Sequence, residues 1–564
     1  MAGGEENCNL MRAFANLIER LILTPQRNGK LRLMQAYFRE TPDPDRGYAL
    51  AALTGSLDFR HAKPGLVRAL VEERVDPLLF RLSYDYVGDL SETVSLIWPA
   101  PEHGPANDPD PPLGEVVGQL DAATRATLPS IVAGMLDRLD ETGRWAFLKL
   151  ITGGLRIGVS ARLAKTALAG LGDVPLSDIE EIWHGQKLPY EALFDWVLGE
   201  GPRPQNDDPA PFRPVMLAQP LGDTDLETLN ADDFAAEWKW DGIRVQAVGA
   251  TDSQDRPVRR LYSRTGDDIS GAFPDILEAL DFDGAIDGEL LVVREGAVQP
   301  FNSLQQRLNR KTVTGKMLKA FPAHIRAYDL LVAGDEDLRA LPFAERRKRL
   351  EHFIGQIESD RIDLSPDVPF NDWDALAAAR ADPASAGAAH DADAVEGVML
   401  KRHDSTYEAG RPKGPWFKWK RDPFNVDAVL MYAQRGHGKR SSLYSDYTFG
   451  VWRESEDGPE LVPVGKAYSG FTDEELKRLD KFVRDHTVDR FGPVRAVRAD
   501  AETGLVLEVA FEGLNESTRH KSGIAMRFPR IARIRWDKPT READTLDNLV
   551  RLLPQRKTGV TQAG

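Results

Sequence analysis

The stretch EWKWDGIR, residues 237 to 244, alternates charged and apolar side chains. Successive side chains of a β-strand point to opposite faces, so the pattern predicts a strand that buries its two tryptophans. The charged side chains of Glu237, Lys239 and Asp241 then share the other face. A lysine beside acids is commonly part of a salt bridge, but a lysine whose pKa is lowered by burial or by nearby cations can act as a nucleophile.

The residues around this strand predict an α+β domain from 211 to 421. Runs typical of strands, such as AIDGELLVV (285–293) and VEGVMLKR (395–402), alternate with helical patterns such as LRALPFAERRKRLEHFI (338–354). The Ala/Asp-rich segment LAAARADPASAGAAHDADA (376–394) is predicted to be a surface loop.

The region before this strand predicts an all-α domain over residues 1–205. Apolar residues recur at helical spacing from Leu10 to Leu21 and again from Ile131 to Leu139. The Pro/Asp-rich stretch PAPEHGPANDPDPPLG (99–114) is expected to be an exposed loop, and GEGPRPQNDDPAPFRP (199–214) is expected to be an interdomain linker.

The last part of the chain, residues 422–564, predicts an all-β domain. Short β-type segments, namely VDAVLMY, YTFGVW, LVPVG and GLVLEVAFEGL, are separated by turn residues. Several short strands in about 110 residues are typical of a small barrel. The chain is therefore expected to be a multidomain protein with an all-α, an α+β and an all-β domain.

Length and composition agree with a globular protein of several domains. The 564 residues predict three or four domains, and the contents of 42% hydrophobic and 28% charged residues are ordinary for a soluble protein. The sequence contains no run of about 18 apolar residues, so no membrane span is expected. The first residues do not resemble a secretory signal. The single cysteine, Cys8, excludes internal disulfides and cysteine-cluster zinc sites and suggests the cytoplasm.

The formal net charge of −16 argues against a general polyanion binder. A nucleic-acid site on this chain must therefore be a local basic surface on an acidic protein.

The segment from Lys239 to Arg244 is similar to the KxDGxR signature of covalent nucleotidyltransferases, the superfamily of ATP-dependent ligases and mRNA capping enzymes. Further motifs of this superfamily follow in order: SRTGDD with Arg264, DGELLV with Glu289, AYDLL with Tyr328, EGVMLKR with Glu396, WFKWK with Lys418 and Lys420, and RFPRIARIRWDK from Arg527 to Lys538. A single KxDG is weak evidence, but this many motifs in order make the resemblance specific.

The resemblance implies an adenylation (nucleotidyltransferase) domain followed by an OB-fold, with Lys239 as the nucleophile. Lys239 would attack the α-phosphorus of ATP and become a lysine–AMP phosphoramidate. The implied nucleotide contacts are Glu237, Arg244, Arg264, Glu289, Tyr328, Arg411, Lys418 and Lys420, with Tyr328 stacked on adenine. Glu289 and Glu396 would hold Mg²⁺, which ATP chemistry requires.

The two strand lysines Lys418 and Lys420 are expected to contact the α-phosphate and to help lower the pKa of Lys239. Taken singly, several of these residues have ordinary structural alternatives. Glu289 and Glu396 lie next to glycine and could be turn residues, and Tyr328 could be a core residue.

Three features favour a DNA ligase with an N-terminal DNA-binding domain. FLKLITGGLRIGVSARLAKTALA (147–169) resembles that domain through Gly153, Gly154, Arg156 and Gly158, although a simple helix–turn–helix joint is the alternative. The last motif has the ligase form, with Arg527, Arg530, Arg535, Asp537 and Lys538 expected to orient the β,γ-pyrophosphate; a soluble edge strand is the alternative. The single cysteine counts against NAD-dependent ligases, which carry a four-cysteine zinc module. In addition, Lys439 and Arg440 would form a basic hairpin facing the duplex.

The resemblance therefore implies an ATP-dependent enzyme that seals nicks in duplex DNA for repair, replication or recombination. It implies a monomer that encircles DNA in the cytoplasm or nucleoid, with any repair partners on separate chains. Two alternatives stay open: an RNA ligase or GTP-using capping enzyme, and a DNA-binding protein whose transferase domain has lost activity.

Overall fold

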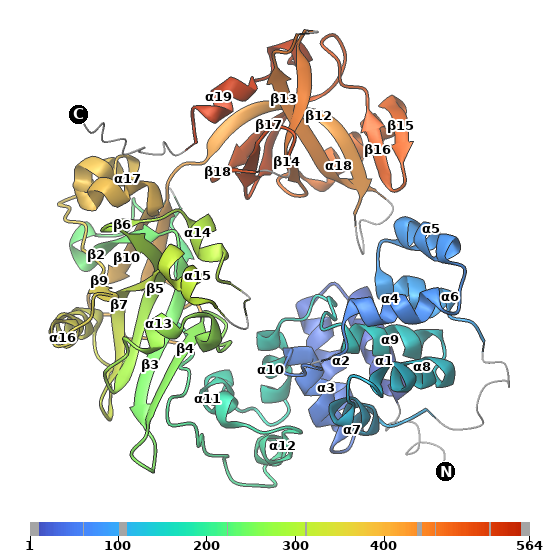
Figure 1. Ribbon diagram of the computed structural model, residues 1–564. Coiled ribbons are helices and arrows are strands. Elements are labelled where there is room, and N and C mark those ends of the chain that lie inside the picture. The colour runs from blue at the N-terminus through green and yellow to red at the C-terminus, as the bar shows by residue number, and fades with distance from the viewer. Residues whose placement is uncertain are drawn as a thin grey trace. The chain divides into compact units, whose positions relative to one another are not determined.

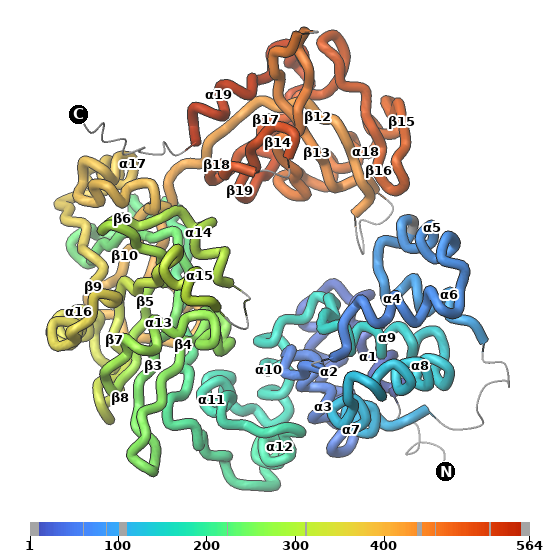
Figure 2. Tube along the Cα trace, in the orientation of Figure 1, coloured from blue at the N-terminus to red at the C-terminus, as the bar shows by residue number. Residues whose placement is uncertain are grey.

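The structure is a computed structural model that describes residues 11–553 except 60, 101–109, 223, 309, 311–312, 437–442, 457 and 518–519 (Figures 1 and 2). Cys8, Lys439, Arg440 and most of the predicted loop near residue 100 lie outside the described residues. Contacts within the chain group Glu180–Gly185 with Asn206–Pro423 as one compact unit.

The N-terminal region is helical, as its apolar spacing predicts. Its long side chains meet in a core that includes Phe14, Phe38, Phe147 and Phe194, each fully buried. The α-helices are α1 (Met11–Leu23), α2 (Arg27–Glu40), α3 (Asp45–Thr54), α4 (Pro64–Glu72), α5 (Pro77–Val87), α6 (Leu90–Ile97), α7 (Leu113–Ala122), α8 (Leu128–Arg138), α9 (Glu141–Ile151), α10 (Ala161–Ala169), α11 (Leu176–Ile182) and α12 (Glu191–Leu198). Residues 199–214 of the predicted linker contain neither helix nor strand.

The unit formed by Asn206–Pro423 contains two β-sheets, as the α+β prediction requires. The smaller sheet has the order β1-β11-β10-β2, and the larger has the order β4-β3-β5-β7-β8, with β6 on β5 and β9 parallel to β7. The bounds are β1 (Gln219–Pro220), β2 (Phe234–Trp240), β3 (Ile243–Thr251), β4 (Pro257–Ser263), β5 (Gly284–Arg294), β6 (Ala297–Val298), β7 (Ala323–Ala333), β8 (Glu336–Asp337), β9 (Ile362–Leu364), β10 (Val395–Arg402) and β11 (Trp416–Lys420).

Helices cover these sheets. The longest, α16 (Phe343–Gly355), packs against β7 and β9. The shorter ones are α13 (Pro274–Leu277), α14 (Phe301–Gln305), α15 (Gly315–Ala320) and α17 (Trp373–Ala381).

The loop prediction for the Ala/Asp-rich segment 376–394 is wrong. Its first part belongs to α17, where the side chain of Asp372 caps the helix by accepting a hydrogen bond from the backbone N–H of Ala375. Short helical turns continue to Ala394. Alanine is the strongest helix former, and Leu376 is completely buried in the apolar cluster beside β10. Composition suggested a loop, whereas burial of Leu376 makes the first part of the segment a helix.

The C-terminal region is rich in strands, as predicted. Its main sheet has the order β14-β13-β12-β16-β15, and β17 joins β12 to β20. The elements are β12 (Phe424–Arg435), β13 (Tyr444–Arg453), β14 (Glu460–Ala467), α18 (Asp473–His486), β15 (Thr487–Phe491), β16 (Val494–Val497), β17 (Val506–Phe511), β18 (Gly513–Glu516), β19 (Ile524–Arg527), β20 (Arg530–Arg535) and α19 (Leu546–Val550). The assignment of this region to the OB-fold and the three predicted domain boundaries stay predictions.

None of the helices in the described residues has the length and apolar character that crossing a bilayer requires.

Candidate active site

The strand that carries Lys239 has the two faces that its alternation predicts. Trp238 and Trp240, each 3% exposed, lie in the apolar cluster behind β2. The indole N–H of Trp240 donates a hydrogen bond of 3.0 Å to the hydroxyl of Ser365. The contacts of the two tryptophans hold the buried face of the strand in place. The opposite face presents Lys239 to a cavity.

The register of three strands places the charged side chains in rows. Gly397 of β10 is paired with Lys239 of β2 on one side and with Lys420 of β11 on the other. A Cβ atom on Gly397 would lie 2.2 Å from the carbonyl oxygen of Trp419, and its φ of +147° disfavours other residues. A glycine at this position therefore lets the two lysine strands approach β10 closely.

The glycine of the KxDG motif has a comparable steric reason. A Cβ atom on Gly242 would lie 2.5 Å from the carbonyl oxygen of Leu290 on β5. The turn after β2 can therefore pass directly over β5, which brings Lys239 of the small sheet toward Glu289 of the large sheet.

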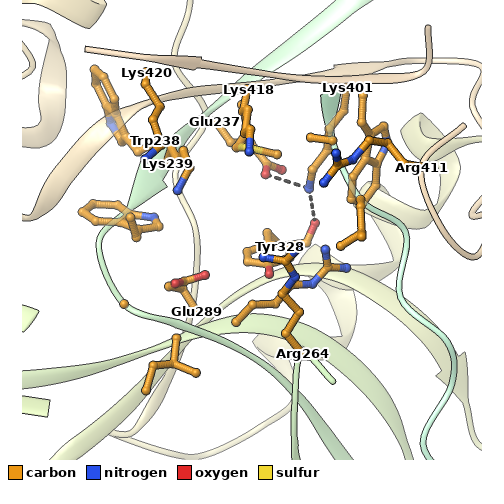
Figure 3. A pocket seen from close by; sticks show the side chains of 18 residues that line it. Glu237, Trp238, Lys239, Arg264, Glu289, Tyr328, Lys401, Arg411, Lys418 and Lys420 are labelled. Carbon is orange, nitrogen blue, oxygen red and sulfur yellow. Dashed lines mark hydrogen bonds and ion pairs between the residues drawn. The ribbon is translucent and has the colours of Figure 1, made fainter. Parts of the chain in front are cut away.

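A cavity of about 420 Å³ opens between the two sheets (Figure 3). The predicted site residues that line it are Glu237, Lys239, Arg244, Arg264, Glu289, Tyr328, Arg411, Lys418 and Lys420. Its other lining residues include Trp416, Met399 and Lys401, which the motifs alone did not single out. Residues as far apart in the sequence as Leu217 and Lys420 thus meet at one site.

The amine of Lys239 is held by an acid from another strand. Its Nζ lies 2.5 Å from Oε2 of Glu396, and Nζ of Lys420 lies 3.7 Å from the same oxygen. Burial lowers the pKa of Lys239, but Glu396 and Glu289 outweigh burial, so that its pKa is raised. The expected contribution of Lys418 and Lys420 toward a lower pKa does not decide the net shift in the nucleotide-free site, because Glu396 and Glu289 outweigh the opposing effects.

The carboxylates of Glu289 and Glu396 lie on the same side of the cavity as the amine. Burial and the charge of Glu396 raise the pKa of Glu289 to about 8, against the opposing effect of Lys239. No group of three or more His, Cys, Asp and Glu side chains suited to a metal occurs among the described residues. Two carboxylates near a phosphate site still fit Mg²⁺, which commonly takes one or two carboxylates and fills its other positions with phosphate oxygens and water.

Arg244 is anchored at the floor of the cavity by a buried polar network. It donates to Asp287 at 2.6 Å and to the hydroxyl of Tyr407 at 3.0 Å, and Tyr407 donates to the same carboxylate. In the described part of the chain, Nε of Arg244 and Nε1 of Trp416 are buried without a hydrogen-bond partner. Buried donors are normally satisfied, so both indicate room for a polar ligand in this cavity.

Glu237 and Lys401 form a second buried ion pair at the aromatic side of the cavity. Oε2 of Glu237 lies 2.7 Å from Nζ of Lys401, which also donates to the carbonyl oxygen of Tyr328 at 3.0 Å (Figure 3). The same Nζ lies 4.7 Å from the ring centres of Tyr328 and Trp416.

Lys401 was missed because strict alternation from Glu396 points it to the opposite face. A β-bulge between Val395 and Gly397 shifts the register, so that Glu396 contacts the amine of Lys239 while Lys401 lines the cavity. The only sequence signal was a charged residue within the otherwise apolar run VMLK of the EGVMLKR motif.

Comparison with known proteins decides the family. Residues 215–420 match the family described as ATP dependent DNA ligase domain, and residues 440–538 match its C-terminal region. A probable DNA ligase of Koribacter versatilis is 30% identical over 95% of this chain and 95% of its own length. The DNA ligase of Methanoculleus marisnigri is 32% identical over 73% of this chain and 71% of its own length.

The chain belongs to the family of ATP-dependent DNA ligases. This ligase is an enzyme that forms phosphodiester bonds and uses ATP as a substrate. A solved structure described as Pmar-Lig_PreS3 covers 93% of this chain and 99% of its own, with a TM-score of 0.55 and 14% identity, and is a likeness of fold alone.

The ligase segment predicted to bind DNA forms the loop between α9 and α10. Gly153 and Gly158 have φ values of +75° and +66°, and Arg156 also has a positive φ. A side chain of α2 holds the loop: Nζ of buried Lys30 donates to the carbonyls of Ile157 at 2.7 Å and Gly158 at 2.9 Å. These hydrogen bonds fix the backbone of the loop, and its contact with DNA stays a prediction.

The last ligase motif lies on β19, β20 and the following turn of the C-terminal region. Arg535 pairs with Asp537 at 2.9 Å, and Lys538 pairs with Asp427 at 2.6 Å. Arg530 lies 3.9 Å from Glu512, and the guanidinium of Arg527 lies over the ring of Phe528. Their contact with the nucleotide stays a prediction, and the predicted hairpin residues Lys439 and Arg440 lie outside the described residues.

Proposed function

We propose that this ligase seals nicks between a 5′-phosphate and a 3′-hydroxyl in duplex DNA through an adenylate on Lys239. The observation that carries the proposal is the position of Lys239 among carboxylates and other cations at the cavity. Its amine lies beside Glu396 in a cavity that also contains Glu289, Lys418 and Lys420. This arrangement combines a nucleophile with cations for phosphate oxygens and carboxylates for a metal ion.

The proposed reaction has three transfers at phosphorus. First, Nζ of Lys239 attacks the α-phosphorus of ATP, a P–N bond forms, pyrophosphate leaves and the amine loses a proton. Second, an oxygen of the 5′-phosphate attacks the same phosphorus, and the P–N bond breaks to release Lys239. Third, the 3′-hydroxyl attacks the 5′-phosphate, loses its proton and displaces AMP. Each step depends mainly on in-line positioning and charge neutralisation.

Cations at one end of the cavity support binding of the phosphates. Burial, together with the charges of Lys239 and Arg411, lowers the pKa of Lys418. Cations that lie close together repel one another, and a bound anion relieves this repulsion. Lys418, Lys420, Arg264 and Arg411 are therefore proposed as phosphate contacts, with Arg244 at the sugar.

Glu289 and Glu396 are proposed to hold Mg²⁺ together with phosphate oxygens. The bound ion would neutralise charge on the phosphates and polarise them for attack. Since Glu396 now pairs with Lys239, occupation of these carboxylates by a metal would compete with the ion pair.

The opposite end of the cavity suits a purine. Tyr328 and Trp416 supply aromatic surface, and Glu237 and Lys401 supply a polar edge between them. Tyr328 is proposed to stack on adenine, and Glu237 is proposed to accept a hydrogen bond from the base.

Contacts with DNA are proposed outside this cavity. The α9–α10 loop with Gly153, Gly154, Arg156 and Gly158 would bind phosphates through its backbone, which is contact independent of sequence. Lys439 and Arg440 would add cations from the C-terminal OB-fold. Arg527, Arg530, Arg535, Asp537 and Lys538 would orient pyrophosphate in the first step, and the chain would act as a monomer around the duplex.

The experiment is a ligation assay with a nicked duplex whose 5′-phosphate is labelled, with ATP and Mg²⁺. Sealing by the native protein, transient accumulation of adenylated DNA and loss of both in Lys239→Ala are expected. A matched control is Lys348→Ala, a lysine of the same unit that does not line the cavity. Sealing that persists in Lys239→Ala would refute the role of Lys239, and sealing only of duplexes with an RNA donor strand would identify an RNA ligase.

A further inference from the structure

Glu237 is an unusual carboxylate for a ligand site, because it is only 2% exposed and is held by cations from two elements. Oε2 contacts Lys401 of β10 at 2.7 Å, and Oε1 contacts Arg347 of α16 at 3.3 Å. Lys401 lines the cavity, whereas Arg347 does not. Arg347 therefore contacts the lining of the cavity through Glu237.

Arg347 is itself fixed in one orientation. Its side chain is 9% exposed, and it donates to the backbone carbonyl of Ser365 at 2.7 Å. It also pairs with Asp367 at 3.1 Å and with Glu351 at 3.3 Å. Ser365 accepts the indole hydrogen bond of Trp240, so that the guanidinium is tied to the same strand that carries Glu237 and Lys239.

The ionisation of Glu237 decides which purine it can bind. An ionised carboxylate only accepts hydrogen bonds, and a protonated one can also donate. Adenine carries an amino donor at the position where guanine carries a carbonyl acceptor. A fixed, ionised Glu237 at the base edge therefore favours adenine and repels the carbonyl oxygen of guanine.

Lys401 and Arg347 both contact the buried carboxylate of Glu237, and their charges favour its ionised form. Burial raises the pKa of Glu237, and the two cations oppose this rise without cancelling it, while Asp367 adds to it. Without Arg347, one of the two opposing cations is lost and Oε1 has no partner to fix its direction.

We propose that Arg347 is a positioning residue that orients Glu237 from behind and thereby sets the preference for ATP over GTP. The inference rests on the proposed function, because it requires the nucleotide in this cavity and Lys239 as the group that is labelled. It adds a residue outside the cavity to the determinants of base selectivity.

The test is the rate of covalent labelling of the full chain by α-³²P-labelled ATP and GTP with Mg²⁺ in the absence of DNA. Arg347→Met is expected to keep ATP-dependent labelling but to lower the ATP-to-GTP rate ratio about tenfold or more. Arg347→Lys, which restores a cation, is expected to recover part of the ratio. Glu351→Gln removes a half-exposed partner of Arg347 and is the matched control, with a ratio within about twofold of the native protein.

Outcomes separate the two proposals. A native protein that is labelled by neither nucleotide contradicts the proposed function. A folded Arg347→Met that is labelled with the native ratio overturns the present inference alone. Should Arg347→Met not fold, Glu237→Gln decides, because its amide can donate to guanine: a lowered ratio supports the inference, and a native ratio overturns it.

Discussion

Nζ of Lys239 and Oε2 of Glu396 lie 2.5 Å apart, although 157 residues separate them in the sequence. The pair joins β2 to β10 and favours the ammonium form of the lysine that is proposed as the nucleophile. Because an ammonium has no lone pair for attack, the proposed reaction requires Lys239 to separate from Glu396 and to lose a proton. The same acid is proposed to bind the metal, so we expect binding of metal and nucleotide to weaken the pair.

Gly397→Ala should damage the site without removing any charged group. The new Cβ would lie 2.2 Å from the carbonyl oxygen of Trp419 and would push β10 away from β11. Since Gly397 is paired with both Lys239 and Lys420, the lysines would lose their register, and labelling by ATP should fall more than about tenfold. Gly315→Ala at the start of α15, where nothing lies within 4 Å of the new Cβ, is the control. Equal labelling rates for the two variants would contradict the packing argument.

The network around Arg244 predicts two effects of different size. Asp287→Ala leaves the arginine without its buried carboxylate and should destabilise the catalytic unit by about 3–5 kcal/mol. Tyr407→Phe removes one hydroxyl from the network and should cost about 1–2 kcal/mol while raising KM for ATP. Thermal unfolding and labelling kinetics measure both effects, and a tyrosine variant as damaged as the aspartate variant would mean that the hydroxyl has another function.

Lys30→Met should separate DNA binding from adenylation. Methionine fills the same space but cannot hold the carbonyls of Ile157 and Gly158, so the α9–α10 loop should lose its shape. Nick affinity should fall about tenfold, with labelling by ATP within about twofold of the native rate. Binding measured over a range of salt should weaken steeply with salt in both proteins. A variant that binds nicks with native affinity would place the DNA site elsewhere in the helical region.

The buried pair of Asp275 and Arg307 predicts a dependence of stability on acid. Arg307 is fully buried and contacts Asp275 at 2.5 Å. Burial raises the pKa of Asp275, but hydrogen bonds from Arg307 and the backbone of Ala323 outweigh it, so the folded-state pKa is lowered below 3.8. The stabilisation is thus complete above the ordinary pKa and is lost as the pH falls through the lower folded pKa.

Asp275→Asn should therefore unfold more easily near neutral pH, and its difference from the native protein should shrink at acid pH. Urea unfolding of both proteins at several pH values measures this difference. A difference that grows on acidification would contradict the assigned sign.

The sequence predicted the parts of the site that follow from local patterns. The alternation around Lys239 predicted its strand, and the β-type runs AIDGELLVV and VEGVMLKR predicted the strands that carry Glu289 and Glu396. These side chains line or adjoin one cavity because their strands belong to the two sheets that enclose it.

The rest depended on contacts that no local pattern contains. Lys401 faces the cavity only because a β-bulge reverses the alternation after Glu396. Glu237 pairs with Lys401 and Arg347 instead of flanking Lys239, since strands and a helix distant in sequence supply its partners. The net direction of the pKa shift of Lys239 also depends on acids of β5 and β10.

The central claim is that Lys239 forms the covalent adenylate. The most direct measurement is to incubate the protein with ATP and Mg²⁺ without DNA, digest it and locate the AMP-bearing peptide by mass spectrometry. We predict a single adduct on Lys239, which disappears when nicked DNA is added. An adduct on Lys401, Lys418 or Lys420 instead, or AMP that nicked DNA does not remove, would contradict the account.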